Sequence, residues 1–573
     1  MRVLPDVAAL RRTFDYSIPT SWHDDGRAGS ITVGTMVRAE LHGRRIAGWV
    51  TELDPATEPG VALRPLTRLS GVGPPAHLVD LAQWAAWRWA GSPSAFLRTA
   101  SPPTMVARVV ETARSSAGVG HVAGWAHDAF DGAGSVVRVP PLGDRWPLIL
   151  AAVARGNALI VVPSIHQSQV VAGRLRRLGV RVALHPRDWA LGAGGATVVG
   201  GRTAAFAPVA GLAAIVMIDE HDEVYQQEQA PTWHAREVLV ERAARAGVPI
   251  VVTSPIPTPE ARSVLPLLEP GRPTERAGWP MVRVVDLRTD DTARGTLWTS
   301  ALVRAFDVEG RVAVVLNRKG RARLLACAAC DSLATCTECD AAMRQGDDPG
   351  QLECPSGHHR PVVCDACGAT RFKQLRVGVT RASEELEALL REPVAEVTGD
   401  AEDLPDGRVL VGTEAVLHRV DGLDAVAFVD FDQELAAPRY RSAEQALALL
   451  VRAGRLVGGR RDGTGEVLVQ TRQPDHPAIR AAVTADVEPW AQGEMARRRI
   501  LRYPPFAALA HVSGAMAEEF ITRLGEPLGI EVRGPADGAW LVRADDPATL
   551  ADALAAVERP KGRLRVAVDP LRI

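Results

Sequence analysis

Residues 327 to 367 read CAACDSLATCTECDAAMRQGDDPGQLECPSGHHRPVVCDAC, and this stretch contains every cysteine of the chain. Six of the seven cysteines form Cys-x-x-Cys pairs, namely Cys327 with Cys330, Cys336 with Cys339, and Cys364 with Cys367. The two thiolates of such a pair leave one tight turn and can bind the same tetrahedral zinc ion. Three pairs in so short a stretch therefore predict zinc binding.

A disulfide framework is the alternative interpretation of clustered cysteines. Disulfides at this density are typical of small secreted domains. This chain has 573 residues, and no secretory segment is recognisable at its start. We therefore favour zinc. Sites closed by four protein ligands leave no position for a reacting water, so the expected role of the metal is structural.

Seven cysteines are one ligand short of two all-cysteine sites. We expect one zinc ion to be bound by Cys327, Cys330, Cys364 and Cys367. A second, inner ion would then be bound by Cys336, Cys339, Cys354 and a fourth ligand, for which His358 is the candidate. His359 is the neighbouring alternative. The sequence thus predicts two zinc ions per chain.

The composition is that of an ordinary globular protein, with 46% hydrophobic and 23% charged residues. A chain of this length is expected to form about three to five domains. No apolar run is long enough to cross a bilayer, so we expect a cytoplasmic protein without a membrane partner. The net charge of −2 excludes a globally basic surface, and any DNA contact must come from local basic patches.

About the first hundred residues are predicted to form a β-rich domain. Residues 31–40 and 45–53 have strand-like patterns, and His42-Gly43 between them is typical of a hairpin turn. Phe14-Asp15-Tyr16 precedes the strands, although such a triplet is more often part of a core or turn than of a binding site. Residues 115–134 are rich in glycine, alanine and aspartate, and we interpret them as a linker.

Short apolar segments alternate with helical patterns from residue 136 onwards. The expected strands are 158–162, 180–184, 197–199, 213–218 and 248–253. Such alternation is typical of a parallel sheet that is covered by helices on both faces. Ligands of these sheets bind at the carboxyl ends of the strands, where Asp219 and Glu220 are expected to lie.

A second α/β lobe is predicted from about residue 302 to residue 475. Its expected strands are 312–316, 409–411, 425–429 and 467–470. The cysteine stretch interrupts this lobe. An insertion of that size is too small to build its own core, and bound zinc would supply the missing stabilisation.

The last part of the chain begins with a charged helix, expected over residues 487–499, which ends in Arg497, Arg498 and Arg499. Residues 508–568 then follow the order strand, helix, strand, strand, helix, strand, which predicts a ferredoxin-like split βαβ domain. Arginines at the end of a helix most often complement the helix dipole. In a DNA-binding protein they are candidates for phosphate contacts.

The order of these motifs resembles that of the PriA family, the bacterial replication-restart proteins also called primosomal protein N′. The resemblance covers nearly the whole chain. It rests on Phe14-Asp15-Tyr16, Asp219-Glu220-His221-Asp222, Trp233-His234-Ala235-Arg236, Asn317-Arg318-Lys319-Gly320, the cysteine stretch, Val411-Gly412-Thr413, Asp430-Phe431-Asp432, Pro438 to Arg441 with Glu444, Gln470-Thr471, His476-Pro477 and Pro504-Pro505-Phe506. Each motif alone is weak, but their order around a double-zinc insertion is specific.

The resemblance implies a multidomain α/β protein: a β-rich N-terminal domain, two degenerate superfamily 2 helicase-like (RecA-like) lobes with a zinc-binding insertion, and an α+β C-terminal domain. The expected boundaries are 1–110 for a domain that binds 3′ DNA ends, 111–135 for the linker, 136–300 for the first lobe, 301–480 for the second lobe with its insertion at 325–370, and 481–573 for the C-terminal domain. The expected DNA contacts are Phe14, Asp15, Gly43, Arg497 and Arg498.

The chain departs from the family's pattern where that family binds nucleotide. The family's phosphate-binding loop has the form GxxxxGK[ST], whereas residues 141–146 read PLGDRW here and no lysine precedes Lys319. Aligned on His221, Ile218 stands where the family has a magnesium-linked aspartate, and Asp219 or Glu220 could take that place only with a one-residue slip. The family's late arginine motif is altered in residues 452–460. These departures lead us to expect a protein that is not an enzyme and lacks ATPase and helicase activity.

The function implied by the resemblance is replication restart at stalled or abandoned forks. The protein would bind branched DNA and promote primosome assembly and reloading of the replicative helicase. Its partners would be primosome proteins and the replicative helicase or its loader. Two alternatives stay open: an active ATP-dependent 3′–5′ superfamily 2 DNA helicase, and a zinc-ribbon interaction protein that does not recognise forks.

Overall fold

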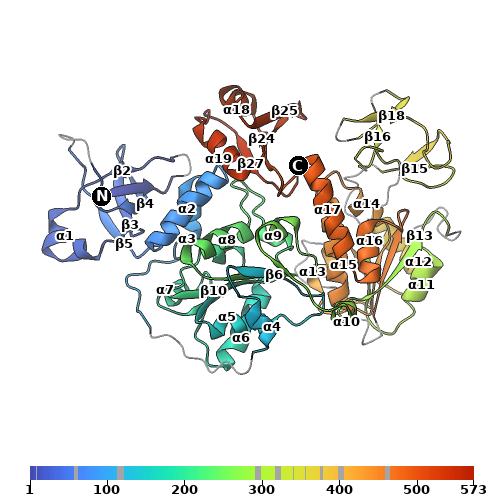
Figure 1. Cartoon of the computed structure of the whole chain (residues 1–573), viewed down its shortest axis with the longest axis horizontal. Coiled ribbons are helices and arrows are strands. Elements are labelled where there is room, and N and C mark those ends of the chain that lie inside the picture. Colours follow the sequence, from blue (N-terminus) through green and yellow to red (C-terminus); the bar gives the residue numbers. More distant parts are fainter. Residues whose placement is uncertain are drawn as a thin grey trace. The chain divides into compact units, whose positions relative to one another are not determined.

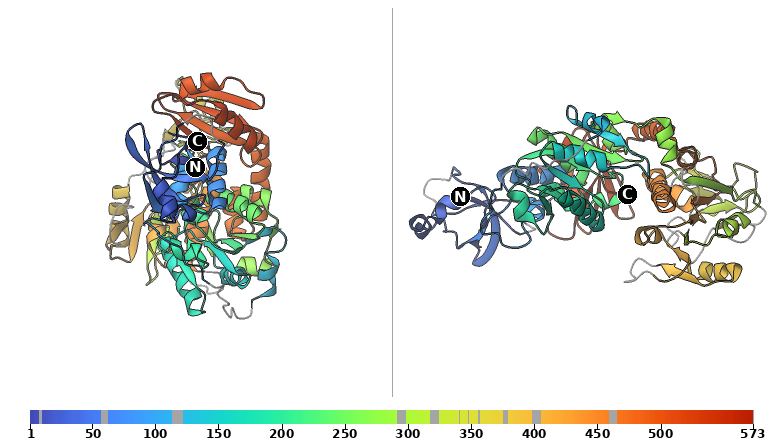
Figure 2. Two further views of the ribbon diagram at one scale, coloured as in Figure 1. Left: turned by 90° about the vertical axis from the view of Figure 1, so that its left-hand side faces the viewer. Right: turned by 90° about the horizontal axis from the view of Figure 1, so that it is seen from below.

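The computed structural model describes residues 1–7, 10–56, 62–112, 122–290, 298–316, 324–339, 341–346, 348–354, 357–374, 379–397, 405–458 and 465–572 (Figures 1 and 2). The chain forms two compact units, one of residues 1–137, 145–268 and 497–571, and the other of residues 138–144, 269–496 and 572–573. The expected motif Asn317 to Gly320, the pair Gly459 and Arg460, and part of the expected linker lie outside the described residues.

The first unit begins with a five-stranded antiparallel sheet of order β2-β1-β4-β3-β5. Its strands are β1 (Arg2–Pro5), β2 (Phe14–Asp15), β3 (Met36–Leu41), β4 (Arg44–Glu52) and β5 (Arg68–Gly71). β3 and β4 form the expected hairpin, with φ angles of 49° at His42 and 77° at Gly43. Two positive φ angles match the right-handed twist of the strands. The first strand of the hairpin begins later than expected, because a turn at Gly34 (φ 91°) precedes it.

Two helices, α2 (Ala76–Arg88) and α3 (Pro93–Ala100), follow this sheet. Their apolar side chains belong to one large core that also contains residues of the following α/β lobe and of the C-terminal domain. An aromatic chain shows this continuity: the ring of Phe96 lies 5.7 Å from that of Phe206, which lies 5.3 Å from that of Trp233. The N-terminal helices therefore pack on the first lobe as part of the same unit.

The first lobe is a seven-stranded sheet of order β12-β6-β11-β10-β7-β9-β8. Its strands are β6 (Gly134–Arg138), β7 (Asn157–Val161), β8 (Val182–Leu184), β9 (Thr197–Gly200), β10 (Leu212–Met217), β11 (Ile250–Ser254) and β12 (Leu267–Leu268). The central pairs are parallel. The helices α5 (Trp146–Ala154) and α6 (Ile165–Arg177) cover one face, and α8 (Ala235–Ala246) covers the other (Figure 1). The predicted doubly covered parallel sheet is confirmed.

The second lobe is a six-stranded parallel sheet of order β13-β23-β22-β14-β21-β20. Its strands are β13 (Met281–Asp286), β14 (Val312–Val315), β20 (Val394–Val397), β21 (Val409–Gly412), β22 (Ala425–Phe428) and β23 (Glu466–Thr471), and α11 (Ser300–Ala305), α12 (Val379–Leu390) and α15 (Ser442–Val457) accompany them. β13 lies before the expected start of this lobe. It pairs with β23 over its whole length, and the apolar pattern of a strand does not reveal which sheet it joins.

The cysteine stretch forms a small insertion between β14 and α12. β15 (Leu325–Cys327) pairs with β19 (Phe372–Gln374), and β16 (Arg344–Gln345), β17 (Gln351–Glu353) and β18 (His359–Pro361) form a three-stranded sheet. The core of the insertion consists of Ala334, Cys336, Met343, Leu352 and Cys354. Two of these five residues are cysteines, so the insertion depends on its thiols for packing as well.

The C-terminal domain has the predicted split βαβ order. It consists of β24 (Ala508–Ser513), α18 (Ala517–Leu524), β25 (Ile530–Ala536), β26 (Ala539–Ala544), α19 (Pro547–Ala556) and β27 (Arg565–Val568), and α17 (Glu488–Leu501) precedes it. The sheet order is β25-β26-β24-β27, and its pairs are antiparallel. This arrangement confirms the α+β fold expected for the end of the chain.

Within the parts of the chain that the structure describes, no helix has the length and apolar character needed to span a membrane.

Candidate metal centres and nucleic-acid interface

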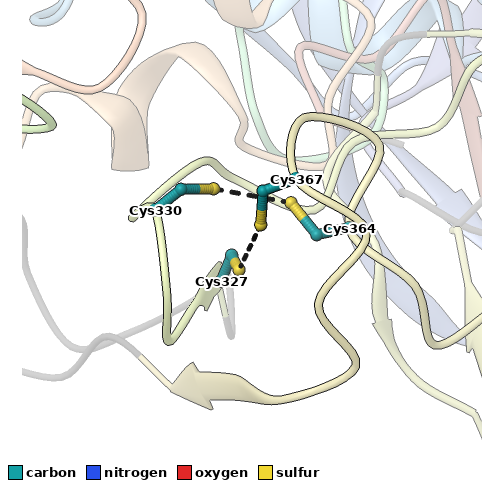
Figure 3. A group of neighbouring side chains, drawn as sticks. All are labelled: Cys327, Cys330, Cys364 and Cys367. Carbon is teal, nitrogen blue, oxygen red and sulfur yellow. Dashed lines mark hydrogen bonds between the residues drawn. The ribbon is translucent and has the colours of Figure 1, made fainter.

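Four cysteines of the insertion, which we name the outer cluster, face one another (Figure 3): Cys327, Cys330, Cys364 and Cys367. The Sγ atoms of Cys327 and Cys367 are 3.6 Å apart, and those of Cys330 and Cys364 are also 3.6 Å apart. Sulfurs bound to one tetrahedral zinc ion at 2.3 Å are about 3.8 Å from each other. The outer cluster therefore has the spacing of a four-coordinate metal site.

The inner cluster consists of Cys336, Cys339, Cys354 and His358. Nδ1 of His358 lies 3.4 Å from Sγ of Cys336 and 3.5 Å from Sγ of Cys354. The Sγ atoms of Cys339 and Cys354 are 3.9 Å apart. A nitrogen and a sulfur on one tetrahedral zinc ion are about 3.5 Å apart. Both clusters could therefore hold a metal ion, and thiolate and imidazole ligands suit zinc.

The second ring nitrogen of His358 also has a partner. Its Nε2 lies 3.5 Å from a carboxylate oxygen of Glu338. An acceptor at Nε2 favours the tautomer with its proton on that nitrogen, which leaves the lone pair of Nδ1 free for a metal. His359 instead lies on β18 with an exposed side chain and belongs to neither cluster. Of the two neighbouring histidines, the structure brings only His358 to the cysteines.

The outer cluster favours the charged form of one of its thiols. Hydrogen bonding with the side chain and backbone of Ser332 lowers the pKa of Cys330 to about 6. The thiolate is the form that binds metal. The pKa values of Cys364 and Cys367 in the same cluster are raised instead, so the lowered pKa distinguishes Cys330 from these two thiols.

The two acids expected at the carboxyl end of β10 lie there, and each is paired with an arginine. Nε of Arg145 is 3.3 Å from Oδ1 of Asp219. Glu220 is fully buried and accepts hydrogen bonds from Nη1 of Arg236 at 2.7 Å and from the backbone N–H of Thr258 at 2.8 Å. Burial raises the pKa of Glu220, and the charge of Arg236 opposes that shift. Glu220 is thus part of a buried ion pair.

His221 lies at the same edge of the sheet. Its Nδ1 is 2.9 Å from Oγ of Ser254, which ends β11. The contact joins the ends of two adjacent strands, β10 and β11. Ile218, which the resemblance aligned with the family's magnesium-linked aspartate, is apolar and 5% exposed.

A second acidic pair, Asp430 and Asp432, follows β22 in the second lobe. The Asp432 carboxylate accepts hydrogen bonds from the hydroxyl of Thr471 at 2.6 Å and from the backbone N–H of Arg472 at 2.9 Å. The Arg472 guanidinium lies 3.4 Å from Asp432 and 3.7 Å from Asp430. Burial and the neighbouring Asp432 carboxylate raise the pKa of Asp430 from 3.8 to about 7. Burial raises the pKa of Asp432 as well, so the two carboxyl groups share the proton that the pair holds.

This pair predicts a pH dependence of stability. Between about pH 4 and pH 7 the folded protein keeps a proton on this pair that the unfolded chain has lost, so stability falls as the pH rises through that window. The loss is at most about 1.4 kcal/mol per pH unit. We expect Asp430→Asn to reduce this slope and to stabilise the protein at pH 8, because it removes the carboxylate that faces Asp432. Urea unfolding between pH 4 and 8 measures it, with exposed Asp307→Asn as the control; an unchanged slope in Asp430→Asn would contradict the prediction.

Phe14 and Asp15, two of the expected DNA contacts, form the edge strand β2. Nε of Arg2 donates to Asp15 at 3.0 Å, and Arg2 also pairs with Glu52 at 2.6 Å. The guanidinium of Arg12 lies 5.0 Å from the centre of the Phe14 ring. An aromatic ring and a carboxylate thus lie side by side at this edge with two arginines around them.

Gly43, the third expected contact, is at the tip of the β3–β4 hairpin. A Cβ atom added there would meet no other atom within 4 Å, so the tip is open. The hydroxyl of Tyr16, next to Asp15, donates to the backbone carbonyl of Glu40 at 3.3 Å. This bond links the end of β2 to the hairpin strand three residues before Gly43.

The expectation for Arg498 needs correction. Its side chain is 1% exposed, and its Nη1 donates to Glu260 at 3.1 Å and to the carbonyl of Pro504 at 3.3 Å. A guanidinium held in this way cannot reach a phosphate. Arg497 is half-buried, whereas Arg499 is exposed and stacks on the ring of Phe506 at 4.5 Å. At this helix end Arg499 has the accessibility that we expected of Arg498.

Sequence reasoning missed two groups that the structure makes important. Arg236 was noted only within a family motif, although its guanidinium holds Glu220 and donates to Oγ1 of Thr258 at 3.0 Å. Glu338 lies between Cys336 and Cys339. This position could have indicated its contact with His358, because a residue in the turn between two ligands can reach a neighbouring ligand. No local pattern indicated the burial of Arg236.

Known proteins are similar in sequence to this chain. Residues 2–102 match the PriA 3′ DNA-binding domain (3′BD) family. The "Probable replication restart protein PriA" of Mycobacterium leprae is 28% identical to this chain. The match covers 93% of this chain and 90% of the Mycobacterium leprae protein. The replication restart protein PriA of Bacillus subtilis is 30% identical over 63% of this chain. The chain is similar to PriA proteins over nearly its whole length.

The extent of these matches differs between PriA relatives. The match with the Bacillus subtilis protein covers 50% of that protein, and the match with Treponema pallidum PriA, 29% identical, covers 57% of it. The chain thus spans about half the length of several curated relatives that it matches.

Two solved structures can be aligned with part of the chain. A DEAD box protein from Methanococcus jannaschii is 12% identical with a TM-score of 0.31, covering 63% of this chain and 88% of its own. RecG bound to a three-way DNA junction is 11% identical with a TM-score of 0.35, covering 63% of this chain and 43% of its own.

The expectation that the chain is not an enzyme is contradicted by its relatives. They are named replication restart protein PriA, the family whose members the resemblance identified as ATP-dependent DNA helicases. The expectation rested on missing residues alone. The structure places a cation, Arg145, beside Asp219 at the carboxyl end of β10, so residues at this edge interact in a way that the motif comparison did not include.

Proposed function

We propose that this protein acts in replication restart. It binds branched DNA at stalled or abandoned forks through an N-terminal domain of residues 1–110 that recognises a 3′ DNA end. It then promotes primosome assembly and reloading of the replicative helicase. The observation that carries the proposal is the match of residues 2–102 to the PriA 3′ DNA-binding domain.

The geometry of the N-terminal sheet supports this proposal. The Phe14 ring offers a face on which a base can stack, and the adjacent Asp15 carboxylate is an acceptor for a 3′-hydroxyl. Asp15 cannot attract a phosphate, but its bond to Arg2 holds the carboxylate in place. The open hairpin tip at Gly43 allows a nucleotide to approach the backbone closely.

The proposal includes two zinc ions, one in the outer and one in the inner cluster. The spacing of the eight ligand atoms supports it. The metal would be structural, because each cluster supplies four protein ligands and so closes the coordination sphere. When bound, zinc would hold together an insertion whose core has few apolar side chains.

Recognition of the 3′ end predicts a selective defect. We expect Asp15→Asn to reduce the preference for forks with a free 3′-hydroxyl over forks with a blocked 3′ end by about tenfold or more, because a hydrogen bond to a charged group contributes about 1.5–3 kcal/mol. Fluorescence anisotropy with the two forks measures the ratio. Glu52→Gln is the matched control, since Glu52 is the other carboxylate bound to Arg2. Equal affinity of the unaltered protein for both forks would refute the proposed end recognition.

A further inference from the structure

One face of the sheet of the N-terminal domain carries three exposed arginines: Arg38 on β3, Arg45 on β4 and Arg68 on β5. The strand register places Arg38 directly opposite Arg68, and Glu40 opposite Arg45. Residues two apart on a strand share a face of the sheet. The three arginines therefore lie on one face, which we name the arginine face.

The other face of these strands is the core. Val37 and Ala39 alternate with Arg38 along β3, and each is 1% exposed. They pack with Leu69 of β5 and Ile46 of β4. The sheet therefore has a fixed inner side, and the register cannot shift to bury the arginines without exposing these apolar side chains.

The arginine face keeps its positive charge. The described residues contain no carboxylate partner for Arg38, Arg45 or Arg68. Two carboxylates nearby are engaged elsewhere: Glu40 pairs with Arg64 at 2.7 Å, and Asp6, whose N–H donates to the carbonyl of Ala47, pairs with Arg98. Like charges directly opposite each other destabilise a sheet. Folding alone gives no reason for the pair Arg38 and Arg68.

We propose that the arginine face binds the phosphate backbone of a double-stranded DNA arm. Guanidinium groups bind phosphate oxygens in a bidentate manner, and a row of anionic phosphates relieves the repulsion between Arg38 and Arg68. Besides its arginines, the exposed part of this face presents Glu40 and Ala47 and no described aromatic side chain for base stacking. Contacts to the backbone of a duplex are therefore favoured over contacts to unpaired bases.

The position of this face fits the proposed end recognition. β3 and β4 carry two of the three arginines and are joined at the hairpin tip by Gly43. A duplex arm on the arginine face would run beside the strands whose tip approaches the 3′ end. The inference rests on the proposed DNA binding but assigns a different surface and a different part of the DNA.

The test is the salt dependence of binding to a fork whose 3′ ends are blocked, so that end recognition contributes nothing. Each phosphate contact contributes about 0.9 to the slope of log affinity against log salt concentration. We expect the double variant Arg38→Gln/Arg68→Gln to reduce the slope by about 1.8 and to weaken binding at 50 mM salt by at least about tenfold. Arg27→Gln is the control in the same domain, because Arg27 already pairs with Asp25.

A second measurement separates DNA binding from a structural role. Arg38 and Arg68 are like charges that face each other across paired strands. Removing both charges is therefore expected to leave the melting temperature of the double variant unchanged or to raise it. If the double variant has the same salt slope as the unaltered protein, the proposal is overturned. This holds also if the double variant binds an acidic peptide more weakly, because the arginine face would then bind a protein and not DNA. Loss of slope together with a lowered melting temperature also overturns it. The unaltered protein could bind forks with free and blocked 3′ ends equally while the double variant still has a smaller salt slope. That result would refute the proposed end recognition and support the proposed role of the arginine face.

Discussion

Replacing His358 by alanine is expected to reduce the zinc content from two ions per chain to one. His358 is the one member of the inner cluster that is not a cysteine, and its Nδ1 faces two thiols within 3.5 Å. Three remaining thiols do not close a tetrahedral site. Because structural zinc contributes about 10–16 kcal/mol of apparent binding free energy to small zinc-dependent folds, the inner half of the insertion should unfold when its ion is lost.

Elemental analysis of purified protein measures the zinc content, and limited proteolysis locates the unfolding. New cleavage is expected near the inner cluster, while the two parallel sheets stay intact. His359→Ala is the matched control, since it removes the adjacent imidazole, which belongs to neither cluster. Two zinc ions in His358→Ala and one in His359→Ala would reverse the ligand assignment. Fewer than two zinc ions in the unaltered protein would refute the two-site proposal.

Replacing Arg236 by methionine should destabilise the first unit by about 3–5 kcal/mol. Methionine keeps much of the side-chain length but leaves the Glu220 carboxylate buried without its cation. Both side chains are at most 3% exposed, so water cannot replace the lost partner. Since burial already raises the pKa of Glu220, the carboxyl is expected to protonate in the variant, which makes the loss smaller at low pH.

Urea unfolding followed by circular dichroism measures this effect. Arg245→Met is the matched control on the same helix, α8, because Arg245 pairs with Glu241 at the surface. An exposed pair of this kind contributes about 0–1 kcal/mol. The double variant Arg236→Met/Glu220→Gln should recover part of the stability, because it removes the uncompensated charge. Equal losses in Arg236→Met and Arg245→Met would contradict the assigned ion pair.

The features that the sequence predicted well depend on residues close together in the chain. A Cys-x-x-Cys pair places two thiols on one turn, and the two clusters contain the residues expected of them. The alternation of apolar strands and helices predicted both parallel sheets, and the strand-helix order predicted the split βαβ domain. The hairpin at His42-Gly43 followed from turn chemistry, since few residue pairs tolerate positive φ at both positions.

The features that the sequence did not predict depend on partners far apart in the chain. β13 joined the second lobe because it pairs with β23 almost two hundred residues later, as the Arg283–Glu466 contact (|i−j| = 183) shows. The absence of nucleotide motifs led to the expectation of a non-enzyme, which the relatives contradict. A missing motif states which local residues are absent, but it does not show what other residues do in their place.

The arginine triplet at the end of α17 shows the same limit on a small scale. Arg497, Arg498 and Arg499 are chemically identical, and the sequence alone predicted a basic helix end. Successive residues of a helix point about 100° apart, so the three side chains must face different surroundings. Which of them is buried depended on Glu260, 238 residues away, which pairs with Arg498. Local chemistry determined that the helix end is charged, and only tertiary packing decided which charge remains exposed.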